Sequence, residues 1–146
     1  MLLGGCQDEA RTTRASPDIA ELMASCQRGE TLELVWRHPV SESDLQQLNS
    51  LTTLEALELH AADLSSDFIA DQIACLTQLK RLRIDGCVVD DRAALSLSQL
   101  SGLRVLNLPQ GTFGDETLAE LATMPHLELL RFGSFNVSDE GIAKLS

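Results

Sequence analysis

Apolar residues recur along this chain with a period of about 24 residues. The pattern starts with four leucines at positions 51, 54, 57 and 59. The same positions recur as Leu76, Leu79, Leu82 and Ile84, as Leu100, Leu103, Leu106 and Leu108, and as Met124, Leu127, Leu130 and Phe132. A fixed period of this length is the sequence signature of a repeat architecture. The last two positions of each set, two residues apart, predict a short strand with one buried face.

A second apolar stripe follows each strand and predicts a short helix, because its members are three or four residues apart. The pairs are Leu45/Leu48, Ile69/Ile73, Ala94/Leu97, Leu118/Leu121 and Ile142/Leu145. Acids stand where these helices begin, at Asp67, Asp90, Asp91, Asp115, Glu116, Asp139 and Glu140. Negative charge stabilises a helix N-terminus, so these acids favour a structural role over an acidic binding patch. One strand and one helix bury their apolar faces only by stacking on the next unit.

The N-terminal part of the chain extends this pattern backwards. A shift of 25 residues places Leu32 and Leu34 at the two strand positions, and Cys26 and Gly29 in the first two places, giving about five units. Ser16-Pro17-Asp18 predicts the start of a capping helix over 16–27, which buries one face. That face carries Ile19, Leu22, Met23 and Cys26.

No comparable cap follows Leu145. Three interpretations stay open for this end: the last helix is itself the lid, the sequence is a piece of a longer solenoid, or another chain covers it. We expect a monomer, because repeat proteins usually cap within one chain.

The pattern L-x-x-L-x-x-L-x-L followed by a capped helix resembles the leucine-rich repeat family over about residues 26–146. The segment from Val137 to Ile142 is similar to the helix-bearing bacterial and ribonuclease-inhibitor-like repeats. The resemblance implies an α/β fold, a right-handed solenoid with a parallel concave sheet and convex helices. The family places Asn or Cys three residues after the last strand leucine, and only Cys87 conforms here. The equivalent residues are Arg37, Ala62, Gly111 and Phe135.

Composition explains the same pattern and narrows the partners. Leucine provides 27 of 146 residues against five aromatic residues, because one cross-section is filled in every unit. A net charge of −11 would repel a polyphosphate backbone, which argues against nucleic acid as a partner.

Catalytic signatures are missing from the sequence. It contains no G-x-S-x-G, H-E-x-x-H, G-x-x-x-x-G-K-[ST] or G-x-G-x-x-G motif, and His38, His60 and His126 lie in different units. The cysteines at 6, 26, 75 and 87 lack the spacing of a zinc site, and we expect Cys26, Cys75 and Cys87 to act as small core residues. The sequence therefore predicts no enzyme, no cofactor and no metal site.

The first residues carry a separate signal. Leu3-Gly4-Gly5-Cys6 resembles the lipobox of bacterial lipoproteins, although only five residues precede Cys6. On this interpretation 1–15 are a signal remnant and tether, 16–146 form the repeat domain, and a lipid on Cys6 anchors the protein to the cell envelope. The alternative is an accidental apolar start, which leaves a cytoplasmic protein.

The concave face is the expected binding surface. Its first predicted column holds Glu33, Glu58, Arg83, Asn107 and Arg131, and its second holds Val35, His60, Asp85, Pro109 and Gly133. Neighbours such as Glu58 with Arg83, or Glu55 with Lys80, have the charges to pair with each other. Trp36 is either the anchor of an interface or a shield for the first unit.

The leading hypothesis is a non-catalytic module that binds another protein through these columns, possessing no membrane contact except through Cys6. The alternative is a structural or regulatory segment of a larger repeat protein.

Overall fold

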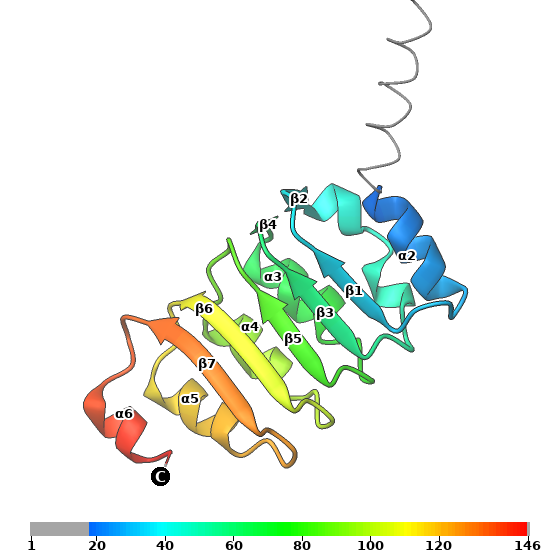
Figure 1. Cartoon of the computed structure of the whole chain (residues 1–146). Helices are drawn as coiled ribbons and strands as arrows, with labels where there is room; N and C mark the ends of the chain where they lie inside the picture. The colour runs from blue at the N-terminus through cyan, green and yellow to red at the C-terminus, as the bar shows by residue number, and fades with distance from the viewer. Residues whose placement is uncertain (1–17, 146) are drawn as a thin grey trace, which may run out of the picture.

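The computed structural model describes residues 18–145 and has an α/β architecture built on a parallel sheet of five strands. The strands lie side by side in chain order, and Figure 1 shows them running in the same direction. They are β1 (Glu33–Trp36), β3 (Ala56–Leu59), β5 (Arg81–Ile84), β6 (Val105–Gly111) and β7 (Leu129–Ser134). Between them the chain crosses to the other layer and returns, so each strand lies next to the strand of the preceding unit.

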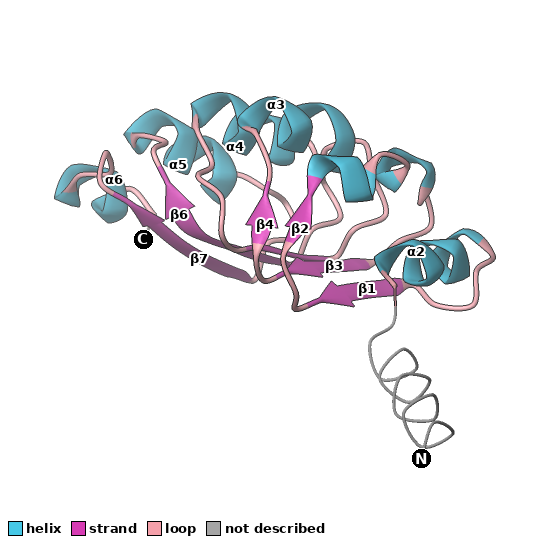
Figure 2. Ribbon diagram, turned by 90° about the horizontal axis from the view of Figure 1, so that it is seen from above, coloured by secondary structure: helices cyan, strands magenta, loops and turns pink. Residues whose placement is uncertain are grey.

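Helices cover one face of the sheet, and none of the described helices lies on the other face, here called the open face (Figure 2). The helical elements are α2 (Ile19–Gln27), η1 (Glu42–Leu45), η2 (Leu48–Ser50), α3 (Ser66–Phe68), η3 (Ile69–Ile73), α4 (Asp91–Leu97), α5 (Asp115–Ala122) and α6 (Asp139–Ala143). A small two-stranded sheet of β2 (Val40–Ser41) and β4 (Ala62–Asp63) joins the layers. The second unit departs from a regular α-helix, because η3 winds as a wider π-helix.

The alignment of the strands confirms the predicted spacing for four of the five units. Leu57 pairs with Leu82, Leu82 with Leu106, and Leu106 with Leu130. The placement of the first unit from the sequence was wrong by two residues, because Leu34, and not Leu32, pairs with Leu57. Leu32 is 41% exposed, whereas Leu34 is fully buried. A shift of two residues keeps every side chain on the same face, so alternation alone does not reject the wrong register.

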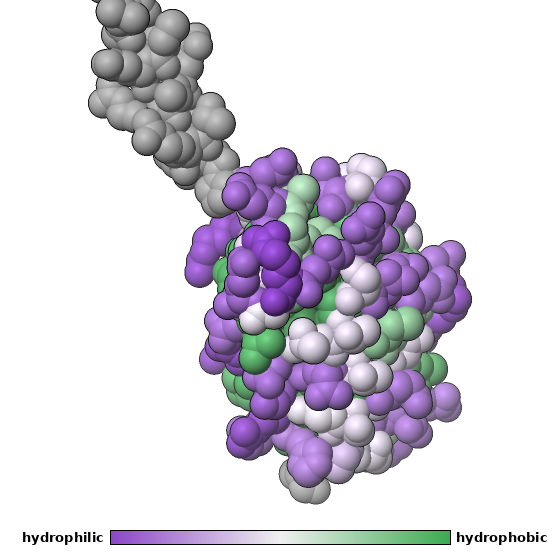
Figure 3. Space-filling view, turned by 90° about the vertical axis from the view of Figure 1, so that its right-hand side faces the viewer, coloured by the Kyte–Doolittle hydropathy of each residue, from purple (hydrophilic) through white to green (hydrophobic). Residues whose placement is uncertain are grey.

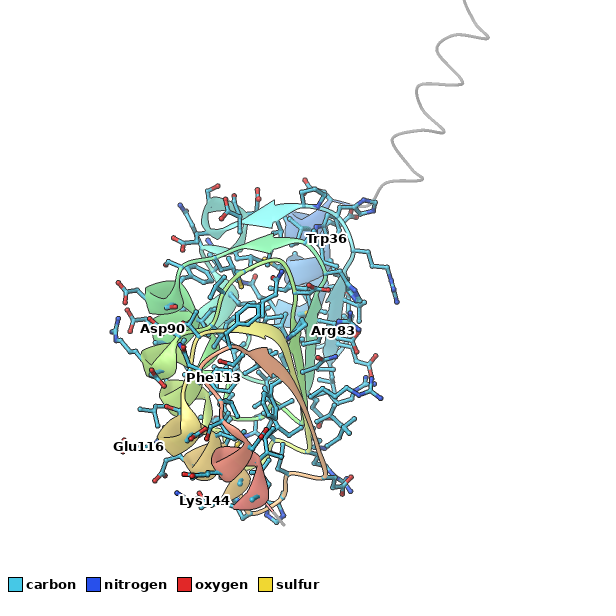
Figure 4. All side chains as sticks on the ribbon, turned by 90° about the vertical axis from the view of Figure 1, so that its left-hand side faces the viewer. Trp36, Arg83, Asp90, Phe113, Glu116 and Lys144 are labelled. Atoms are coloured by element: carbon cyan, nitrogen blue, oxygen red, sulfur yellow. The ribbon has the colours of Figure 1, made fainter. Side chains whose placement is uncertain are left out.

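The predicted apolar positions form one continuous core. In the three units from Leu51 to Leu108 all twelve lie at 1% exposure or less. Phe113 fills the space between helices and sheet, as Figure 4 shows. In the last unit Leu127, Leu130 and Phe132 are only partly buried, because no further unit covers them within the described residues.

The predicted N-terminal cap is present and is shorter than expected. Helix α2 begins at Ile19, and Asp18 is its N-cap, accepting a hydrogen bond from the Ala20 amide at 3.1 Å. Ser16, expected at this place, and Pro17 lie outside the described residues. Three of the four predicted positions are buried, and Leu22 packs partly buried against the core. Among residues 18–145 no strand pairs with the outer edge of β1, and α2 packs against this strand.

A ladder of hydrogen bonds links successive units along the helix layer. In four of the helical segments, the first residue accepts a hydrogen bond from the N-cap amide of the next unit, which a helix start otherwise leaves unpaired. The pairs are Glu42 with Ser65 at 2.7 Å, Ser66 with Asp90 at 3.4 Å, Asp91 with Gly114 at 2.9 Å, and Asp115 with Ser138 at 2.7 Å. Several of the acids at the helix starts therefore hold the units together.

Acid is expected to destabilise the fold through this ladder. Donation by the Ser138 side chain and amide lowers the pKa of Asp115, and Ser65 does the same to Glu42. A carboxyl group whose folded-state pKa is lowered stabilises the fold above its unfolded pKa, near pH 4, and loses this contribution as pH falls through the folded value. We expect the midpoint of urea unfolding to fall below about pH 4. An Asp115→Asn variant should fall less steeply over this window, and an unchanged slope would contradict the assignment.

Candidate functional site

The open face presents three rows of side chains that cross the strands. Row one holds Glu33, Ala56, Arg81, Val105 and Leu129, and row two holds Val35, Glu58, Arg83, Asn107 and Arg131. Row three lies one residue beyond the paired positions and holds His60, Asp85, Pro109 and Gly133. The predicted columns are thus confirmed from Glu58 onwards. In the first unit the predicted columns were wrong. Glu33, predicted beside Glu58, lies in row one beside Ala56, and Val35 lies beside Glu58 in row two.

Ion pairs occupy the end of the open face where the strands begin. Arg81 reaches across Ala56 to Glu33, with 2.7 Å between Nη2 and Oε1, which is why Ala56 is 1% exposed. The predicted pair of Lys80 with Glu55 is confirmed at 3.1 Å, and Arg104 binds Glu128 at 2.6 Å. Exposed pairs such as these contribute at most about 1 kcal/mol each. They neutralise one another and leave this end with little unpaired charge.

A half-buried charged cluster lies at the centre of the open face. Arg83 was expected to pair with Glu58, but its ion pair is with Asp85, two residues further along the same face, at 3.4 Å. His60 Nε2 lies 3.5 Å from Glu58 Oε2. Arg83 Nε and His60 Nε2 are buried and have no hydrogen-bond partner in the part of the chain that the structure describes. The centre therefore combines two acids with donors whose hydrogen-bonding capacity is incompletely used.

Trp36 belongs to the core side of β1. It aligns with the buried Leu59 and packs against the core while partly buried. Its Nε1 has no hydrogen-bond partner among the described residues. Its ring meets that of His38 edge to face, with centroids 5.4 Å apart. Of the two interpretations from the sequence, this position agrees with a shield for the first unit.

An apolar groove of about 420 Å³ adjoins row three at the carboxyl ends of the last strands. Pro109 and Gly133 line it, and Val88 and Phe135 stand at its sides. The Phe135 side chain is as exposed as in an extended chain, at 102%, and Val88 is 53% exposed. A Cβ atom on Gly133 would lie 2.4 Å from the Pro109 carbonyl oxygen, so glycine is required where these backbones approach.

Sequence reasoning missed Val88 and Phe135 as surface residues. Phe135 stands at a turn position that is buried in the three units before it, at Ala62, Cys87 and Gly111. An aromatic residue at a position otherwise held by small side chains was the available signal.

Arg131 is the exposed cation of row two. Its side chain forms no hydrogen bond or ion pair with any part of the chain that the structure describes, unlike the side chains of Arg81 and Arg83. Its neighbour in the row, Asn107, is half buried. Arg131 and the groove together give the β7 side of the open face one free cation beside an apolar depression.

The thiols differ in accessibility, and this predicts their reactivity. Cys26 and Cys87 are buried, as expected, but Cys75 is exposed and the prediction of a core role for it was wrong. Its side chain turns outward, and its Sγ lies 3.0 Å from the Asp71 carbonyl oxygen. Burial raises the pKa of the Cys87 thiol to about 11, which leaves about one thiolate in a thousand at pH 8.

We expect iodoacetamide at pH 8 to label Cys75 within minutes in the native protein and to leave Cys26 and Cys87 unlabelled. Peptide mass spectrometry measures this directly. Equal labelling of Cys75 and Cys87 would contradict the described burial, and labelling of all three in urea is the control.

From 18 to 145 there is no group of three or more His, Cys, Asp or Glu side chains placed to hold a metal ion. Within the same range no helix is long and apolar enough to cross a membrane. The predicted lipidation site, Cys6, lies outside the described residues. In a comparison with known protein families, no family model matches the chain.

Proposed function

We propose that the chain is a leucine-rich-repeat solenoid that binds another protein through the open face of its sheet, without catalysis. Three observations support the solenoid: the 24-residue period, the parallel register of corresponding leucines, and the ladder between successive units. A rigid scaffold of this kind offers a large contact area without ordering loops on binding.

The binding proposal rests on one observation: the exposed cation Arg131 lies next to the apolar groove that Phe135 borders. A fully exposed phenylalanine costs free energy in water and is enriched at the centres of protein interfaces. The Arg131 side chain has no partner among residues 18–145, so it gains one on binding without breaking an ion pair there. The partner is therefore a protein that places an apolar side chain in the groove and a carboxylate against Arg131.

A capture experiment tests this proposal. Immobilised wild type is compared with Arg83→Glu plus Arg131→Glu, and with Arg28→Glu plus Arg92→Glu. The control makes the same charge change away from the open face, at residues that are each more than half exposed. We expect the affinity of the open-face variant for the partner to fall at least about tenfold, the equivalent of 1.4 kcal/mol. The control should bind the partner as tightly as wild type does. Recovery of the same partners by both variants would contradict the proposal.

The N-terminal motif supports a second part of the proposal, that a lipid on Cys6 tethers this module to a bacterial envelope. Intact mass spectrometry of protein expressed from its genomic locus is the test. An unmodified Cys6 behind an intact Met1 would rule out the anchor and would leave the open-face proposal untouched.

A further inference from the structure

Glu58 differs from the other acids in the three rows of the open face, because each of the others has an arginine partner. Those pairs are Glu33 with Arg81 at 2.7 Å and Asp85 with Arg83 at 3.4 Å. Among the described residues the Glu58 carboxylate has no lysine or arginine partner, and its one ion-pair partner is the imidazole of His60. The Glu58 side chain is 27% exposed, so it has lost most of its contact with water. A carboxylate in this position requires a counter-charge, which His60 supplies only when it is protonated.

The four side chains of the half-buried charged cluster form a square on two neighbouring strands. Glu58 stands on β3 beside Arg83 on β5, and His60, just after β3, stands beside Asp85, just after β5. The two carboxylates therefore lie on one diagonal, and the guanidinium and the imidazole lie on the other. With a neutral imidazole the square carries two negative charges and one positive charge. With a protonated imidazole its charges cancel.

The side of His60 that faces β1 supplies no acid. The neighbouring position there is Arg37, which is exposed and forms no ion pair among the described residues. His38, also after β1, lies against the Trp36 ring. Glu58 is therefore the carboxylate against which a proton on His60 is placed.

The ring nitrogen of His60 that faces Glu58 is shielded from water. His60 Nε2 lies 3.5 Å from Glu58 Oε2 and has no hydrogen-bond partner among the described residues. A neutral imidazole donates from one nitrogen and accepts at the other, whereas the cation donates from both. Protonation therefore always directs an N–H group at Glu58, and the neutral ring does so in only one of its two tautomers. The counter-charge of Glu58 is thus present in acid and absent in mild alkali.

Charge, and not apolar area, distinguishes this part of the molecule. Hydrophilic residues prevail over the β1 end of the surface, and hydrophobic ones show only in scattered patches (Figure 3). A partner that lies over the first strands meets mainly polar side chains, so its fit there depends on complementary charge. With a neutral His60 the unpaired charge is the negative one of Glu58. The complementary group is a cation, which the net charge of −11 also attracts.

We propose that the partner of the open face places a lysine or arginine side chain against Glu58, and that a proton on His60 competes with this contact. The inference rests on the proposed function and names the regulation of the same surface. When His60 is neutral, Glu58 binds the cation of the partner. When His60 is protonated, Glu58 already has its counter-charge and the imidazolium repels the incoming cation, so binding weakens in acid.

Nuclear magnetic resonance of the full chain alone tests the contact between the proton and Glu58. The ring carbon of His60 and the side-chain carboxyl carbon of Glu58 are followed from pH 8 to pH 5.5. We expect the two signals to move together, and His60→Gln to abolish the movement of the Glu58 signal. His126→Gln is the matched control, because His126 is exposed in the turn before β7, and it should leave both movements unchanged. A Glu58 signal that stays constant while His60 titrates would overturn the proposal.

The affinity for the captured partner at pH 8 and at pH 5.5 tests the competition. We expect wild type and His126→Gln to bind at least about fivefold more weakly at pH 5.5. In His60→Gln and in Glu58→Gln the ratio of the two affinities should be close to one. Glu58→Gln should also bind more weakly than wild type at pH 8, because it has lost the charge that the cation meets. Circular dichroism at both pH values checks that each variant is folded.

The failure of this proposal is distinguishable from failure of the proposed function. The same ratio in wild type and His60→Gln would overturn the competition. Tighter binding of wild type at pH 5.5 would overturn it too and would show that the partner places an acid at the square. Either result leaves binding through the open face standing, provided that Arg83→Glu plus Arg131→Glu still loses the partner. Recovery of the same partners by that double variant would contradict the proposed function and this inference with it.

Discussion

Replacing Phe113 by alanine is expected to lower the free energy of unfolding by about 3 to 5 kcal/mol. Phe113 is fully buried between the sheet and the helices, and its ring lies 5.9 Å from that of Phe132. The space beside it is tightly filled, because a Cβ atom on Gly111 would lie 2.5 Å from the Phe113 ring. The cavity left by alanine therefore has rigid backbone on one side and collapses poorly.

Urea unfolding followed by circular dichroism measures the effect of this substitution. Leu95→Ala is the matched control, because it also truncates an apolar side chain but one that is 41% exposed. We expect the control to cost about 1 kcal/mol or less. Equal losses in the free energy of unfolding for the two variants would contradict the packing of Phe113 between the helices and the sheet.

The substitution Gly86→Ala is expected to cost about 2 to 5 kcal/mol, because it combines two penalties. Gly86 has φ +100°, a conformation that residues with a side chain rarely adopt. A Cβ atom there would also lie 2.9 Å from the Ala62 backbone nitrogen. That amide donates to the Asp85 carbonyl oxygen at 2.9 Å, so neither backbone segment moves freely.

Gly29→Ala separates the two penalties. Gly29 also has positive φ, +74°, just after α2, but a Cβ atom there would meet nothing within 4 Å. This control should cost only the backbone term, about 1 to 2 kcal/mol. Thermal unfolding of the two variants side by side gives the difference, and equal losses would show that the contact with Ala62 carries no energy.

The periodic part of the fold was predictable from the sequence because one cross-section is repeated. Each inward position reads as Leu, Ile, Met or Phe, and the burial of Leu57, Leu82 and Leu106 follows from that alone. The first unit was not predictable to the residue, since its β1 lies 23 residues before β3 where later units use 24 or 25. The segment between β1 and β3, which carries β2, η1 and η2, sets that offset, and no apolar pattern records it.

The candidate site was predictable in outline only. The rows from Glu58 onward follow from strand alternation, which fixes the face of each side chain. The choice of Asp85 over Glu58 as the partner of Arg83 depends on side-chain geometry that spacing does not specify. The exposure of Phe135 depends on its place in the last described unit, because the same turn position is buried at Ala62, Cys87 and Gly111 in the three units before it.

Side-chain footprinting of the complex with the captured partner tests the central claim most directly. Hydroxyl radicals oxidise exposed phenylalanine, and Phe135 is fully exposed in the free chain. Our account predicts that partner binding reduces oxidation of Phe135 severalfold and leaves Leu95, on the helix side, unchanged. Protection of Leu95 with Phe135 still reactive would contradict binding through the open face.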